Sequence, residues 1–236
     1  MSADQSTLVL RLDAPFSAWR WLQAGVFRGT FPVIPHSAAW GMALNLAGIE
    51  SRGDLAQVVT PIRADAPTLE IAVGIEKAGE RATVYQQLHS YPVGNSGAEL
   101  KAKTFGNKYW IAPAKREILV GLVAVVGVRG PRALVERIPL GLAGNLDADR
   151  YGLPFAGDNQ FLFSRIDIVD QGYIADWFVP VDPDDSPSGS TRLTTNIDRG
   201  DSSKTQTPLF QPVPQTACPP ESWITIGPLS TEVKTT

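Results

Sequence analysis

The chain has 236 residues, enough for one large domain or for one domain with a long extension. Hydrophobic residues make up 43% and charged residues 19% of the chain, which indicates a globular core and excludes an intrinsically disordered protein. The formal net charge is -3 at pH 7, so any preference for a polyanionic partner has to come from how the charges are distributed.

The N-terminal part predicts a strand, a loop and a helix. Residues 7–12 (TLVLRL) are apolar and β-prone, and Asp13-Ala14-Pro15 is expected to end the strand. The stretch from Phe16 to Ile49 contains no Asp or Glu, although the chain is acidic overall. Within it, a helix is predicted from Ser37 to Ala47, with Ser37 as its N-cap. We interpret this stretch as the surface that meets a polyanion.

A second strand at residues 69–75 (LEIAVGI) leads into a predicted β-hairpin. Residues 82–88 are extended, a Gly-Asn-Ser-Gly turn occupies residues 94–97, and the return arm is basic and aromatic. No acid lies between Lys101 and Arg116. Because few apolar residues lie near its tip, we expect this hairpin, about residues 84–113, to project from the core.

The remaining elements complete an α+β pattern. A strand (117–128), a helix (131–137), a glycine-rich loop, a strand (161–169) and a possible further strand (173–181) follow in order. The predicted fold is a ferredoxin-like (RRM-like) βαββαβ core with an inserted β-hairpin thumb and an extended C-terminal segment. We assign residues 1–181 to this domain. Residues 182–236, rich in Pro, Ser, Thr and Asp, are expected to be loosely structured and to pack only at their end.

Familiar catalytic motifs are absent from the sequence. It contains no GxxxxGK[ST], GxGxxG, HExxH or GxSxG. His36 and His89 are the only histidines and Cys218 the only cysteine, so we expect no catalytic residue, no metal site and no cofactor. A single cysteine, the lack of a signal peptide and an apolar run too short to span a bilayer favour a cytoplasmic protein.

The residues that remain suit a phosphate-bearing ligand. A helix start offers free backbone N–H groups, arginines make charge-assisted contacts, glycines let a backbone approach closely, and aromatics among lysines stack on unpaired bases. Each feature alone is more often structural, because aromatics are usually core and charge runs are usually solvated faces. The candidate RNA-binding residues are Arg20, Arg28, His36, Ser37, Trp40, Lys101, Lys103, Lys108, Tyr109, Lys115, Arg116, Gly152 and Gly157.

Three stretches resemble the CRISPR-associated Cas-five family of the RAMP superfamily. LVLRLDAPFSAWR, with the Pro-Ser-led helix at Pro35–Gly41 and LNLAGI, resembles the family's opening. Lys115 to Leu119 (KREIL) is similar to the strand that follows its thumb hairpin. RYGLPFAGDNQFLF resembles its glycine-rich segment, closest to variants of subtype I-B-like systems. The likeness covers residues 7–169.

The resemblance implies an RNA-binding subunit of a type I Cascade effector. Such a subunit grips the 5′ handle of the crRNA and caps one end of the backbone-subunit filament. It also contacts the large subunit and meets the target DNA only indirectly. Its thumb lies across the RNA and pushes out a base. No membrane partner is implied.

Two other functions stay open. One branch of the family cuts precursor crRNA with a Tyr, Lys and His group, and metal-free RNA cleavage needs a base and a proton donor. Here Arg116 rather than a histidine follows Lys115, although Tyr85, His89 and Lys108 would all lie on the hairpin. A metal-independent endoribonuclease is therefore the alternative. The third possibility is an assembly subunit that carries no RNA.

Overall fold

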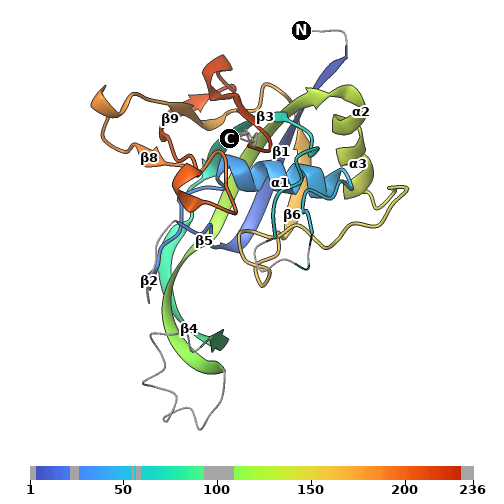
Figure 1. Ribbon diagram of the computed structural model, residues 1–236. Helices are drawn as coiled ribbons and strands as arrows, with labels where there is room; N and C mark the ends of the chain where they lie inside the picture. The colour runs from blue at the N-terminus through green and yellow to red at the C-terminus, as the bar shows by residue number, and fades with distance from the viewer. Residues whose placement is uncertain are drawn as a thin grey trace, which may run out of the picture.

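The computed structural model of the protein describes residues 4–21, 27–54, 56, 60–92, 109–185 and 187–229. It is a mixed α+β fold with a mostly antiparallel sheet and few helices (Figure 1). Its elements in chain order are β1 (Gln5–Ser17), β2 (Phe27–Arg28), α1 (His36–Leu46), β3 (Leu69–Lys77), β4 (Glu80–Pro92), β5 (Tyr109–Pro131), α2 (Arg132–Val135), α3 (Arg137–Leu142), β6 (Arg165–Val169), β7 (Ala175–Pro180), β8 (Thr191–Arg192), β9 (Leu209–Thr216) and β10 (Ile224–Ile226), with short 3-10 turns at Pro183–Asp185, Ser202–Lys204 and Pro220–Ser222.

The strand β5 is the centre of the sheet, whose strand order is β6-β1-β5-β3-β7-β9-β8. Its Val- and Gly-rich half pairs antiparallel with β1 on one side and with β3 on the other. Residues 122–128 are all buried, as expected for an apolar strand covered on both faces. The strand predicted at residues 117–128 is thus confirmed and is longer than its apolar run.

The strand β1 continues through the Asp13-Ala14-Pro15 stop that the sequence suggested. Ala14 pairs with Leu122 and Phe16 with Val120, so Pro15 lies opposite Gly121. Gly121 adopts φ +70, a left-handed conformation suited to glycine. Pro15 therefore lies within the strand, although a proline supplies no N–H donor to the ladder.

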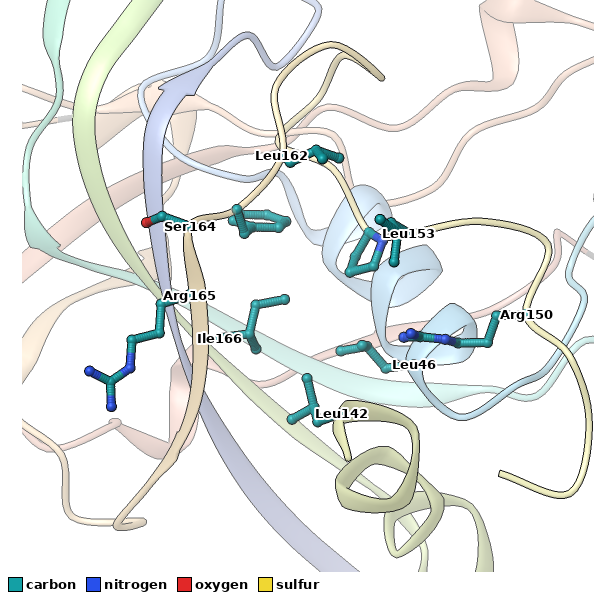
Figure 2. Close-up of a pocket in the computed structure, with 10 residues that line it drawn as sticks. Leu46, Leu142, Arg150, Leu153, Leu162, Ser164, Arg165 and Ile166 are labelled. Carbon is teal, nitrogen blue, oxygen red and sulfur yellow. The ribbon is translucent and has the colours of Figure 1, made fainter. Parts of the chain in front are cut away.

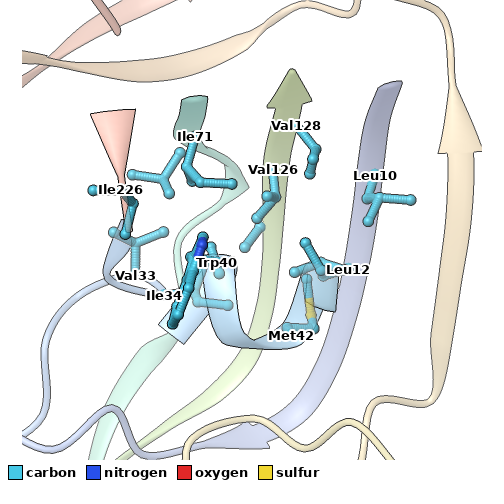
Figure 3. Packing of buried hydrophobic residues seen from close by; sticks show 14 of the residues in the cluster. Leu10, Leu12, Val33, Ile34, Trp40, Met42, Ile71, Val126, Val128 and Ile226 are labelled. Carbon is cyan, nitrogen blue, oxygen red and sulfur yellow. The ribbon is translucent and has the colours of Figure 1, made fainter. Parts of the chain in front are cut away.

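The helices cover one face of the sheet, and C-terminal side chains cover the other. On the helix face, Trp40 and Met42 of α1 belong to one buried cluster with Leu12 and Val126, and Met42 lies beside Leu12 (Figure 3). The predicted helix is confirmed, but it starts at His36, and Pro35 rather than Ser37 is its N-cap. The second predicted helix is divided at Glu136 into α2 and α3.

On the opposite face, Trp177 and Trp223 pack with Val9, Ala72 and Val125. A Cβ on Gly127 would lie 2.6 Å from the Trp223 ring, so a glycine is needed for the indole to come this close to the sheet. This face is therefore closed by the protein's own aromatic side chains.

The C-terminal residues join the sheet, so the expectation of a loosely structured segment is wrong for the part that the structure describes. The strand β9 pairs with β7, β8 pairs with β9, and β10 pairs with β3. Leu193 and Phe210 are fully buried. A few apolar anchors spaced along a polar segment are enough to fix it, because edge-strand hydrogen bonding supplies the rest.

The strands β4 and β5 extend together beyond the sheet as an arm (Figure 1). Their pairing runs from Glu80 with Val120 to Pro92 with Tyr109, which confirms the two extended segments of the predicted hairpin. Its tip, with Lys101, Lys103 and Lys108, lies outside the described residues.

Within the described ranges, no helix is long and apolar enough to cross a membrane.

Candidate nucleic-acid interface

Four segments meet where the arm leaves the sheet, and we call this region the arm root: residues 18–21, 27–31, 81–86 with 113–117, and 155–162. Phe27 and Arg28 pair in parallel with Lys115 and Arg116 of β5. Arg20 forms an antiparallel bridge with Thr30. Segments far apart in the sequence are thereby held around one short section of β5 (Figure 1).

Glu117 braces three of these segments. Its Oε2 accepts a hydrogen bond from the backbone N–H of Thr30 at 3.0 Å and one from Arg81 Nη1 at 2.6 Å. The hydroxyl of Thr30 in turn accepts from the backbone N–H of Trp19 at 2.8 Å. A carboxylate with a charged donor makes bonds stronger than neutral ones, so Glu117 fixes residues 27–31 against the arm.

Arg116 holds the glycine-rich loop in the same way. Its guanidinium pairs with the carboxylate of Asp158, donates to Gln86 Oε1 at 3.3 Å and lies 5.9 Å from the centre of the Phe161 ring. Arg116 and Asp158 are both largely buried, so the pair is poorly screened by solvent. Arg116 therefore acts in the structure as a link between β5 and the loop.

Gly157 is where this loop touches the chain at residues 18–19. It adopts φ +83, and the backbone N–H of Ala18 donates to the Ala156 carbonyl at 2.9 Å. A Cβ at Gly157 would overlap the Ala18 carbonyl oxygen. A glycine is required both by the left-handed conformation and by the close approach. The approach is to the protein's own backbone.

Three cations of the arm root stay free of acidic partners among the described residues. Arg20 and Lys115 are exposed and Arg28 is half-buried, and none of them forms an ion pair within the described part of the chain. Directly opposite residues in a ladder share a sheet face, so Arg28 lies on the face of Arg116, and Lys115 lies on the other face. The arm root thus presents positive charge on both sides.

The start of α1 does not form the predicted phosphate site. His36 is 0% exposed, and burial lowers its pKa to about 3. Its ring stacks on Phe210 at 4.6 Å between centroids. The backbone N–H of Ser37 donates to the Thr194 carbonyl at 3.1 Å, and Trp40 Nε1 donates to the Pro67 carbonyl at 2.9 Å. The expectation of free N–H groups is wrong here because the C-terminal segment covers the helix start.

Gly152 and Tyr109 complete the predicted set. The Gly152 carbonyl accepts from Asn45 Nδ2 at 3.2 Å, and a Cβ at Gly152 would meet no atom within 4 Å. Unlike Gly157, it is not required by its surroundings. Tyr109 begins β5, and its side chain lies outside the described atoms.

A hollow of about 280 Å³ lies on the helix side of the sheet and shares only Leu162 with the arm root (Figure 2). Leu46 of α1, Leu142 of α3 and Ile166 of β6 supply much of its lining. Arg150 points toward Leu46, whereas Arg165 points away from the hollow. Its largely aliphatic lining does not suit a polyanion.

The sequence prediction missed the residues that brace the arm root. Two ion pairs hold the arm root together, Arg81 with Glu117 and Arg116 with Asp158. The sequence analysis searched for side chains that contact a phosphate, so it did not single out Arg81 or the two acids. The available signal was the order of Lys115, Arg116 and Glu117 along a strand. Side chains alternate along a strand, so Lys115 and Glu117 lie on one sheet face and Arg116 on the other.

The chain is similar to CRISPR-associated proteins in sequence and in fold. A sequence profile described as "CRISPR-associated protein (Cas_Cas5)" matches residues 7–138. No curated protein sequence matches the chain. A solved structure titled "CRISPR RNA-guided surveillance complex" aligns with a TM-score of 0.57 and 20% identity, over 90% of this chain and 91% of that chain. It shares the fold. Another, titled "Crystal structure of Cas protein", aligns with a TM-score of 0.47 and 16% identity, over 95% of this chain and 100% of that one. Because the profile covers more than half of its length, the chain belongs to the CRISPR-associated Cas-five family.

Proposed function

We propose that the protein is a non-catalytic RNA-binding subunit of a CRISPR type I Cascade effector. In this role it grips the 5′ handle of the crRNA and caps the filament of backbone subunits next to the large subunit. Family membership supports a place in such a complex. A similar fold in a structure titled "CRISPR RNA-guided surveillance complex" is consistent with it.

The observation that carries the proposal is the set of cations at the arm root. Arg20, Arg28 and Lys115 come from three segments and converge where the arm leaves the sheet. Neighbouring acids are engaged elsewhere, Glu117 with Arg81 and Asp158 with Arg116. The remaining positive charge is therefore available to a phosphate backbone, whose attraction to Lys and Arg dominates RNA affinity.

We further propose that β1, α1, β3, β5, α2–α3 and β6 form a ferredoxin-like βαββαβ core. The antiparallel order β6-β1-β5-β3 supports this topology, as do the two helical elements that follow β1 and β5. The arm is then the thumb insertion between the second and third strands of that core.

Two features favour binding over cleavage. A general base must accept a proton near neutral pH, and an arginine cannot do so. Arg116, which follows Lys115, is also engaged by Asp158. His36 is fully buried and stacked on Phe210, so it is not placed to meet an RNA strand.

Ultraviolet crosslinking of the full chain to RNA transcribed from a CRISPR repeat tests the proposal. We expect crosslinked peptides to include residues 18–31 or 113–117, because these carry the exposed cations. RNA incubated with the protein in EDTA should stay intact. RNA that crosslinks nowhere on the chain would instead favour an assembly subunit, and cleavage in EDTA would favour the endoribonuclease.

A further inference from the structure

One face of the arm root carries two aromatic side chains with a lysine between them. Lys115 pairs with Tyr85 of β4 on one side and with Phe27 of β2 on the other. Residues directly opposite each other in a ladder point to the same sheet face. Phe27, Lys115 and Tyr85 therefore form one row across three strands, which we call the Phe27–Tyr85 row.

The row is open to solvent. Tyr85 is 82% exposed and Phe27 43% exposed, and Lys115 is exposed as well. Adjacent strands lie about 4.8 Å apart, so the two rings are separated by roughly 10 Å and do not stack on each other. Within the described residues neither ring forms an aromatic pair, unlike Trp21, which stacks on Phe31.

Tyr85 is the most exposed large hydrophobic side chain among the described residues, whereas the exposure of Phe27 is similar to that of Phe16, Trp21, Tyr151 and Phe155. Trp177, Phe31 and Phe210 are almost fully buried. A ring as exposed as that of Tyr85 adds little to the packing of the core, and together with Phe27 and Lys115 it offers an aromatic, positively charged strip to another molecule.

We propose that the Phe27–Tyr85 row is a stacking subsite for unpaired bases of single-stranded RNA, an inference that rests on the proposed function. Aromatic rings accept the face of any base, and the lysine between them meets a phosphate of the same strand. A protein partner fits the row less well, because lysine is depleted at the centres of protein interfaces.

Base stacking is distinguished from backbone attraction with abasic RNA. The probe is a single-stranded RNA of the repeat sequence in which one nucleotide at a time is made abasic. Replacing Tyr85 with alanine (Y85A) should weaken binding of the intact RNA by at least about fivefold. In the wild type, an abasic nucleotide at the position that stacks on Tyr85 should weaken binding. Because Y85A lacks the ring, at one or two positions the abasic nucleotide should cause no loss of affinity in this variant. Lys115→Gln should lower the salt dependence, whereas Y85A should leave it unchanged.

Matched variants exclude a folding effect. Y85F keeps the ring and should bind as the wild type does. Val84→Ala removes an exposed apolar side chain from the opposite face of the same strand and should also bind normally. All of these variants should melt at the wild-type temperature, because Tyr85 and Val84 are exposed.

The outcomes separate this inference from the proposed function. If the wild type binds the RNA and Y85A binds it equally well, the stacking subsite is overturned and the proposed function is not. The same conclusion follows if the abasic penalties are identical in the two proteins at every position. Wild-type protein that binds no RNA overturns the proposed function and the subsite with it.

Discussion

His36 is a buried histidine whose two ring nitrogens have no hydrogen-bond partner among the described residues. Its ring lies against Phe210, and the backbone of Thr194 caps the next residue. An imidazole removed from water is held neutral, so the side chain contributes to the fold by packing. From the sequence, a histidine before a helix in an acid-free stretch indicated an anion site. What the sequence could not show is that a segment about 160 residues further on covers it.

This burial predicts a pH dependence of stability. The pKa of His36 is about 3 in the folded protein, against an ordinary value of 6.5. As the pH falls, His36 is protonated in the unfolded chain before it is protonated in the folded protein. The free energy of unfolding is therefore highest above pH 6.5 and decreases as the pH falls toward 3. Relative to a His36→Leu variant, the wild type should lose about 2 kcal/mol of unfolding free energy between pH 7 and pH 5. Urea unfolding of both proteins at each pH measures this, and an unchanged difference would show that His36 is not held neutral.

The arm and the glycine-rich loop show which elements the sequence predicts and which it does not. The pairing of β4 with β5, the helix α1 and the strand β5 follow from apolar periodicity and turn residues. Two features did not follow from the sequence: the full length of β1, and the presence of β8 and β9. The strand β1 continues through Pro15 because its pairing with β5, more than 100 residues away, runs on to Ser17. The strands β8 and β9 are stabilised by pairing, which composition does not report.

A pair of glycines tests how the loop is held at the arm root. Gly157 has φ +83 and no room for a Cβ beside the Ala18 carbonyl, so Gly157→Ala should cost more than about 1 kcal/mol of unfolding free energy. Gly152→Ala is the control, since a Cβ there meets nothing within 4 Å and should change stability little. Thermal unfolding compares the two variants. Equal effects would mean that the loop does not rest on residues 18–19 as described.

In the whole molecule, tryptophan side chains cover the face of the sheet opposite the helices and leave no room there for RNA bases. RNA-recognition domains stack bases on exposed aromatics of that face. Here Trp177 and Trp223 close it over Val9 and Val125, and those side chains are buried with them. The helix face is occupied by α1, α2 and α3. The arm root, in contrast, combines cations that have no acidic partner among the described residues with exposed aromatics, although the net charge of the chain is -3.

The salt dependence of RNA binding tests this central claim most directly. The measurement compares the wild type with a variant in which Arg20, Arg28 and Lys115 are changed to glutamine, using single-stranded repeat RNA over a range of salt concentrations. Each lost phosphate contact reduces the slope of log affinity against log salt by about 0.7, so the slope should become shallower by about 2. A control variant with Arg132, Arg199 and Lys204 changed to glutamine removes the same charge outside the arm root and should keep the wild-type slope. Equal slopes for the wild type and the arm-root variant would contradict the account, because the RNA would then bind elsewhere on the molecule.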